Sequence, residues 1–340
     1  MNYVILPLLM LRCSSESTKS YLSGFELRCK RKIKHPLDNA CNQVESLELP
    51  AITICPKVPD ALNSTALLNH IRISLPEIDN ATIIDLVRFW IGGNGLENMD
   101  VLSRYNRTYL SYLNHLYQKW SNGHSTEDFF HLMQKKFGYS CNELFQECQL
   151  GGRLINCCDD LFRRQIVMRR GICFQTRKGL NQTEADDIGR LVLSIKTLPS
   201  ITSPQYNFIQ PQVVVYITDN FEHVIDFPRF YLYPNEWNRI RFTARYIELI
   251  ESDDVCTKEI FGKDAECLVR RWLLSNIVYP FNCTLSYLSH IDNLPPTNGI
   301  CKPNVIAENY YKNIQLIWNH VTVNEKVCSE DPLILKEFIL

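Results

Sequence analysis

The chain has 340 residues, a net charge of −1 and 45% hydrophobic side chains. This length allows one large domain or two to three ordinary ones, and the composition excludes a disordered protein. The near-neutral charge argues against nucleic acid as a partner, because phosphate binding needs a basic surface. A short basic cluster at Lys30, Arg31, Lys32 and Lys34 is interpreted as a solvated loop.

Cysteines and glycosylation sequons indicate an oxidising, extracellular environment. The chain contains 14 cysteines, an even number that suits disulfides, and a reducing cytosol would not keep such pairs closed. Sequons of the form Asn-x-Ser/Thr, which are glycosylation candidates, occur at Asn63, Asn80, Asn106, Asn181 and Asn282. Together these features favour the secretory pathway.

No apolar run in the sequence reaches the roughly 18 residues that a membrane-spanning helix needs. The most apolar short segment, residues 4–11, could be a signal-peptide core that lacks a charged n-region, or the remnant of a longer apolar segment. We expect residues 1–44 to be an N-terminal segment of one of these kinds, and residues 331–340 to be a truncated C-terminal end.

Strand and helix patterns follow in chain order. Residues 49–55 are rich in β-branched side chains and predict a strand. A helical pattern then covers residues 60–145, is interrupted by glycines at 92–95, and is clearest at 98–120. The apolar stripe of that helix consists of Leu102, Tyr105, Tyr109, Leu113, Leu116 and Trp120. Asn106 lies beside this stripe, so it is the least favoured sequon.

After Cys173 the pattern changes to strands, which we expect at 191–195, 213–217 and 238–249. In the last of these strands apolar and polar residues alternate, with Ile240, Phe242, Ala244 and Tyr246 on the buried face. The opposite face, which carries arginines, is either solvated or in contact with an acidic partner. A helix is predicted at 264–277, capped by Asp264 and ended by Pro280. These elements predict an α+β domain with a mostly antiparallel sheet.

The sequence contains no catalytic or metal-binding signature. Its eight histidines form no His-x-x-x-His pair around a Glu, and no Cys-x-x-Cys pair exists, so structural disulfides are favoured over zinc. A catalytic Cys-His pair needs a cysteine with a free thiol. An even number of cysteines can all be paired in disulfides, so it does not indicate such a thiol. Adjacent carboxylates such as Asp159-Asp160 do not face each other. We therefore expect no catalytic residue, no metal ligand and no cofactor.

Two cysteine-containing runs resemble those of a known family. The run Leu49-Pro50-Ala51-Ile52-Thr53-Ile54-Cys55 is similar to the Phe-Pro-Ala-Val-Thr-Ile-Cys strand of the epithelial sodium channel/degenerin family. The set formed by Cys148, Cys158-x-x-x-Phe162 and Gly171-x-Cys173-Phe174 resembles the cysteine-rich segment of that family, although Phe174 replaces a Tyr and no Phe-Asn follows. Later cysteines resemble the cysteine ladder of its thumb. The disulfide candidates are Cys55, Cys141, Cys148, Cys157, Cys158, Cys173, Cys256, Cys267, Cys283, Cys301 and Cys328.

The resemblance implies a fold and part of its disulfide pattern. The fold would be an α+β, disulfide-rich ectodomain with a mostly antiparallel β palm and β-ball core and a helical finger and thumb. The degenerin-like region would cover residues 45–330, with the finger at 57–145 and the thumb at 255–325. Cys55 would pair with Cys173, and Cys148 with Cys157 or Cys158, since spacing alone does not give connectivity.

The resemblance also implies a function. The chain would be a subunit or fragment of a ligand-gated, amiloride-sensitive sodium channel of the plasma membrane, contributing its extracellular gating domain. It would form a homo- or hetero-trimer with related subunits and pass sodium ions, and the sequence does not identify the extracellular ligand. No pore or selectivity residue is assigned, because the sequence has no counterpart of the family's pore helices. The alternatives are a secreted cysteine-rich glycoprotein that binds a ligand or partner without conducting ions, and a secreted enzyme.

Overall fold

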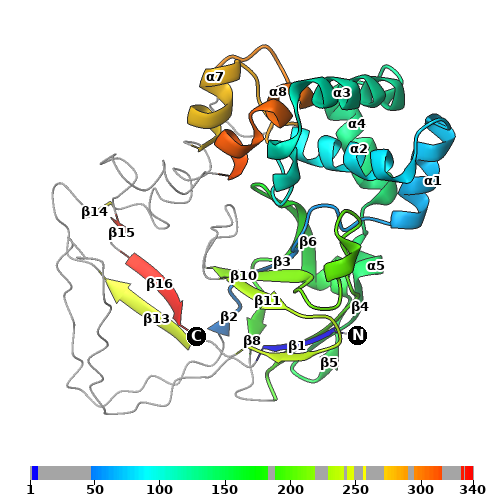
Figure 1. Cartoon of the computed structure of the whole chain (residues 1–340). Coiled ribbons are helices and arrows are strands. Elements are labelled where there is room, and N and C mark those ends of the chain that lie inside the picture. Colours follow the sequence, from blue (N-terminus) through cyan, green and yellow to red (C-terminus); the bar gives the residue numbers. More distant parts are fainter. Residues whose placement is uncertain are drawn as a thin grey trace, which may run out of the picture.

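The computed structural model describes residues 2–6, 47–182, 188–218, 229–240, 243–248, 256–257, 272–289, 295–315, 331–332 and 334–339 (Figure 1). Cys267, Cys328, Asp264 and the basic cluster at 30–34 lie outside these residues, and Cys256 is described through its backbone alone. Among the described residues, helices gather in the upper part of Figure 1 and two sheets lie below them. This arrangement confirms the predicted α+β class.

Two five-stranded sheets make up most of the β structure. The first has the order β12-β1-β9-β4-β5, and the second has the order β11-β10-β3-β7-β6. The first sheet contains β1 (Asn2–Leu6), β4 (Phe145–Leu150), β5 (Arg153–Leu154), β9 (Leu191–Ile195) and β12 (Trp237–Arg239). The second contains β3 (Ala51–Pro56), β6 (Phe162–Val167), β7 (Gly171–Thr176), β10 (Val213–Thr218) and β11 (Arg229–Leu232). All pairings within these sheets are antiparallel except that of β1 with β12.

Three two-stranded pairs complete the described strands. They are formed by β2 (Leu47–Glu48) with β8 (Asn181–Gln182), β13 (Thr243–Glu248) with β16 (Ile334–Ile339), and β14 (Cys256–Thr257) with β15 (Asp331–Pro332). The β13–β16 pair is drawn apart from the two larger sheets in Figure 1.

The two larger sheets pack face to face over one apolar core. Ile52 and Ile54 of β3 and Leu193 of β9 are fully buried in that core. The Phe145 and Phe162 rings stack across it with centroids 4.2 Å apart. Strand β3 is central in its sheet, so both of its faces are covered and residues 51–55 are all buried, including the polar Thr53. The predicted strand at 49–55 is confirmed.

A layer of helices lies against one end of the sheets. It contains α1 (Ser64–Ser74), α2 (Asn80–Gly93), η1 (Asp100–Arg104), α3 (Arg107–Ser121), α4 (Thr126–Phe137) and α5 (Cys141–Leu144). Local side chains start these helices: Asp79 and Ser125 accept N–H bonds from α2 and α4, and Ser140 with Glu143 forms a capping box at α5. Trp90 and Trp120 meet edge to face inside this layer.

A late helical segment packs on the same layer. It runs through η5 (Leu274–Val278), α7 (Tyr279–Phe281), α8 (Pro303–Glu308) and η6 (Tyr311–Gln315). Trp272, Leu273 and Ile277 are fully buried with the helical core. The shorter elements η2 (Cys157–Leu161) and η3 (Pro204–Tyr206) lie in loops of the β region.

Several sequence predictions differ from the structure. The single helix expected at 98–120 is divided, because the Asn106 side chain accepts the N–H of Tyr109 and starts a new helix there. The strand expected at 238–249 is divided into β12 and β13, which belong to different sheets. The helical run that contains Pro280 ends one residue later than predicted, at Phe281, and Asn282 after it has a left-handed backbone.

Residues 2–6 form β1, paired with β9 and β12. The rest of the expected N-terminal segment, up to residue 44, lies outside the described residues. Within the described residues, no helix combines the length and apolar character needed to cross a membrane.

Candidate functional site

The loop after α2 is the meeting point of the sheets, the helical layer and the late helical segment. Gly95 in this loop has a φ of 78°, a conformation that glycine adopts without strain. A Cβ at this residue would also lie 2.5 Å from Leu285 Cδ1. The tight turn directs the next residues, Leu96 to Met99, toward the sheet.

Glu97 joins this loop to the turn between β6 and β7. Its carboxylate lies 3.4 Å from Arg169 Nη1 and also forms an ion pair with Arg170. The Glu97 N–H donates to the Arg169 carbonyl at 2.9 Å. The three side chains are between 4% and 15% exposed, so water screens these charges weakly.

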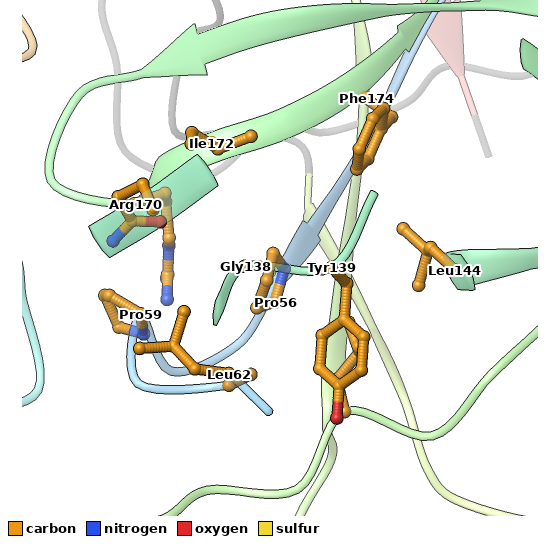
Figure 2. A pocket seen from close by; sticks show the side chains of 12 residues that line it. Pro56, Pro59, Leu62, Gly138, Tyr139, Leu144, Arg170, Ile172 and Phe174 are labelled. Atoms are coloured by element: carbon orange, nitrogen blue, oxygen red, sulfur yellow. The ribbon is translucent and has the colours of Figure 1, made fainter. Parts of the chain in front are cut away.

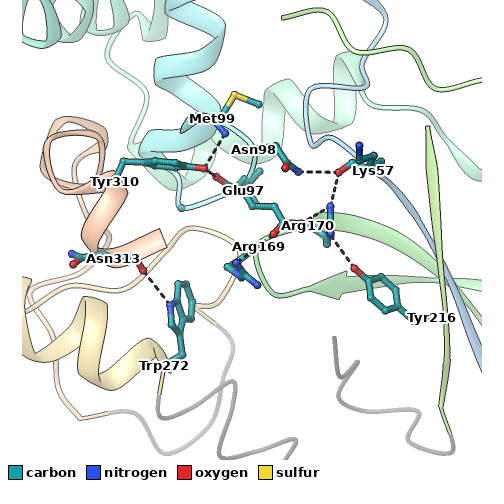
Figure 3. Close-up of polar contacts among 12 residues, drawn as sticks. Lys57, Glu97, Asn98, Met99, Arg169, Arg170, Tyr216, Trp272, Tyr310 and Asn313 are labelled. Atoms are coloured by element: carbon teal, nitrogen blue, oxygen red, sulfur yellow. Dashed lines mark hydrogen bonds and ion pairs between the residues drawn. The ribbon is translucent and has the colours of Figure 1, made fainter. Parts of the chain in front are cut away.

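Arg170 extends the connection into the second sheet. Its Nε donates to the Tyr216 hydroxyl of β10 at 2.9 Å. Its guanidinium also donates to the Lys57 carbonyl just after β3, which accepts a second bond from Asn98 Nδ2 at 3.1 Å. Figure 3 shows Arg170 bonded to Tyr216 and to the Lys57 carbonyl, to which Asn98 also donates.

Two tyrosines hold the same loop from the late helical segment. The Tyr310 hydroxyl donates to the Leu96 carbonyl at 2.7 Å and accepts the Met99 N–H at 3.0 Å. The Tyr287 hydroxyl donates to the Gly95 carbonyl at 3.2 Å and accepts the Arg169 N–H at 3.0 Å. Burial raises the pKa of both hydroxyls well above the ordinary tyrosine value, which keeps them protonated as donors.

We refer to these side chains as the junction cluster, which consists of Glu97, Arg169, Arg170, Tyr216, Tyr287 and Tyr310. It ties together segments that are up to 214 residues apart in the chain. These contacts connect the loop after α2 and the late helical segment to the second sheet.

A disulfide reinforces the sheet directly beside the junction cluster. Cys55 of β3 is joined to Cys173 of β7, the pairing that the resemblance implies. Both sulfurs pack with Tyr216 in a small buried cluster. Lys57 and Arg170 follow and precede these cysteines by only two and three residues, so the disulfide fixes the strands from which the polar contacts extend.

A second connection links the helical layer to the loop between β9 and β10. Asp60 accepts the Thr202 N–H at 2.6 Å and the Ser200 hydroxyl at 2.8 Å. The Arg88 guanidinium of α2 donates to the Thr202 carbonyl at 2.5 Å. Burial raises the pKa of the Asp60 carboxyl, and the bonds from Thr202 and Ser200 oppose that rise in part.

The space between the helices and the second sheet includes a small, mainly apolar cavity (Figure 2). Tyr139, Leu144 and Phe174 lie around it, and Arg170 closes one side. Its volume of about 40 Å³ is close to that of one water molecule. The cavity is therefore too small for an organic ligand.

The other predicted disulfide candidates form compact pairs. Cys141 is joined to Cys158, and Cys148 to Cys157, so of the two partners left open for Cys148 the structure has Cys157. Cys283 is joined to Cys301. Each described cysteine side chain belongs to a disulfide, and within the described residues no group of three or more His, Cys, Asp or Glu side chains could hold a metal ion.

The five sequon asparagines are all exposed. Asn63 and Asn106 cap helices through their side-chain oxygens, which leaves the amide nitrogen, where a glycan attaches, directed away from that bond. Asn282 directly follows α7 and has a left-handed backbone conformation, with a φ of 51°. Since α3 begins after Asn106, the expected crowding of this residue by the apolar stripe is absent.

Sequence reasoning did not find the junction cluster. The signals available were the pair Arg169-Arg170 immediately before Gly171-x-Cys173, and the glycine run that precedes Glu97. The run was interpreted only as a helix end, and α2 does end at Gly93. The structure adds a packing reason: a Cβ on Gly93 would lie 2.8 Å from the Pro303 carbonyl oxygen, so the glycine allows α8 to approach α2.

The fold and the disulfides define a cysteine-braced α+β domain in which the junction cluster and the Asp60 connection join the helices to the sheets. Residues 32–290 match the family model described as amiloride-sensitive sodium channel. The match covers well over half of the chain, and the chain belongs to this family. The family consists of sodium-conducting channels of the plasma membrane, not enzymes. No curated protein matches the chain.

Proposed function

We propose that the chain supplies the extracellular gating domain of a ligand-gated, amiloride-sensitive sodium channel that assembles as a trimer with related subunits. The family membership supports the channel class. The single observation that carries the gating role is the Glu97 carboxylate, which contacts both Arg169 and Arg170. It is an ionic link between the loop after α2 and the turn between β6 and β7.

The buried position of this link would couple the helices to the sheet when a ligand binds. A ligand that binds one arrangement of helices and sheet more tightly than another shifts the population toward it. Packed cores change between discrete arrangements more readily than they deform gradually. A movement of the late helical segment would reach Glu97 through Tyr287 and Tyr310, and would reach the sheet through Arg170.

In this proposal the helical layer has the role of the finger, the late helical segment that of the thumb, and the sheets that of the palm and β-ball. The exposed asparagines of the sequons carry glycans, because glycans are bulky and attach at the surface of extracellular domains. Removal of N-linked glycans should lower the apparent mass of the expressed protein, and an unchanged mass would contradict the glycosylation proposal.

The gating role is tested by voltage clamp of oocytes that express the protein from its complete transcript. The variant Glu97→Gln should change the amiloride-sensitive sodium current several-fold after correction for surface expression. The control variant Glu308→Gln removes a carboxylate whose ion pair with Arg107 is largely exposed and should leave the current unchanged. Equal corrected currents in the wild type and Glu97→Gln would contradict the proposal.

A further inference from the structure

A cavity beside the junction cluster has an excess of basic side chains. Its volume is about 220 Å³, several times the share of one water molecule in liquid. Among the described residues that line it, the basic side chains are Lys57, Arg169, Arg170 and Arg229, and the acidic ones are Glu97 and Asp100. Glu97 pairs with two of these guanidiniums, and the described lining has two more basic than acidic side chains.

The electrostatics of Lys57 agree with this excess. Burial and then the neighbouring Arg170 lower the pKa of the Lys57 ammonium, and Glu97 only partly opposes that effect. An anion placed between Lys57 and the guanidiniums would reduce the repulsion among them. A cation in the same place would increase it.

Neutral donors extend the basic cavity and favour a planar oxyanion. Asn98, Tyr231 and Gln315 also line it. Guanidinium, ammonium and amide donors together match a carboxylate, which accepts several hydrogen bonds in one plane.

A second cavity of about 200 Å³ adjoins the first, because Lys57 and Asn98 line both. Its lining contains no acidic side chain among the described residues, and it combines polar groups such as Ser200 and Asn207 with the apolar Leu198. The Lys57 ammonium donates to Gln210 of this cavity at 3.4 Å. The two cavities share Lys57 and Asn98, and the second continues from the first with polar and apolar groups.

We propose that the basic cavity binds one carboxylate of a small extracellular organic acid, and that the rest of the acid, including a second polar group, occupies the adjoining cavity. The ligand would contact Lys57 and Arg229 at the edge of the junction cluster. Its role as a gating ligand rests on the proposed channel function, whereas its binding is a property of the described domain.

Calorimetric titration of the purified full chain with succinate, at low ionic strength, tests this inference. Succinate should bind, and succinamide, which has the same shape without the charges, should not. Lys57→Met should weaken succinate binding about tenfold to a hundredfold, the range expected for one charged hydrogen bond. The control variant Lys178→Met, which changes an exposed lysine outside the cavity, should bind like the wild type.

Arg229→Gln provides a second variant and should weaken binding by a similar factor if Lys57→Met does not fold. Equal binding of succinate and succinamide, no succinate binding by the wild type, or full affinity in a folded Lys57→Met or Arg229→Gln protein would overturn the inference. Succinate binding without any sodium current in oocytes would contradict the proposed function and leave this inference standing.

Discussion

The substitution Glu97→Gln tests the energetic role of the junction cluster most simply. It removes the carboxylate shared by Arg169 and Arg170, whose side chains are only 6% and 4% exposed. Breaking a buried ion pair by removing one partner lowers the free energy of unfolding by about 3–5 kcal/mol, because an uncompensated charge remains buried. For a domain of this size the corresponding decrease in melting temperature is roughly 6–20 °C.

Thermal unfolding of the purified chain, followed by circular dichroism, measures this decrease. The matched control is Glu308→Gln, because Glu308 lies 3.8 Å from Arg107, a side chain that is 89% exposed. Loss of such an exposed pair changes stability by about 0–1 kcal/mol. If the two variants melt at the same temperature, the argument that Glu97 compensates two buried charges is refuted.

Three further perturbations follow from the structure. Replacing Cys55 and Cys173 by Ser opens a disulfide that spans 118 residues, so the free energy of unfolding in denaturant should fall by about 4–5 kcal/mol; a fall below 1 kcal/mol would contradict this. Gly95→Ala places a Cβ 2.5 Å from Leu285 at a positive φ, so we expect a loss of at least about 1 kcal/mol, and a melting temperature equal to that of the wild type would exclude the clash. The pKa of the Asp60 carboxyl is raised in the folded state, so the folded protein binds its proton more tightly than the unfolded chain does. The stability that this protonation contributes is fully present below the pKa of Asp60 in the unfolded chain, and it is lost as pH rises through the higher pKa of the folded state. The wild type should therefore gain stability relative to Asp60→Asn on acidification through that window, and a pH-independent difference between the two would count against the assignment.

Local sequence patterns predicted the parts of the fold that neighbouring residues determine. The β-branched residues of β3 predicted this strand. The family resemblance predicted that Cys55 of β3 pairs with Cys173. The helix stripe was also recognised correctly as buried, since Leu102 and Leu113 both face the helical core. The break at Asn106 was missed because the apolar residues keep their three- and four-residue spacing from η1 into α3, although the helical backbone is interrupted between these two elements.

The junction cluster could not be predicted because it depends on contacts between distant segments. Glu97 and Arg169 look like ordinary surface charges in the sequence, and only the fold places them together with 15% and 6% side-chain exposure. Tyr310 reaches Leu96 across 214 residues, a distance at which no spacing rule applies. The position of Arg170 beside the family's Gly-x-Cys run was the one local sign of its role.

The sodium current of the complete protein tests the central claim most directly. Oocytes that express the protein from its complete transcript should show a current that amiloride blocks and that disappears when external sodium is replaced by N-methyl-D-glucamine. Cells in which the protein reaches the surface, alone or with related subunits, but in which sodium replacement changes no current under any applied ligand would contradict the account.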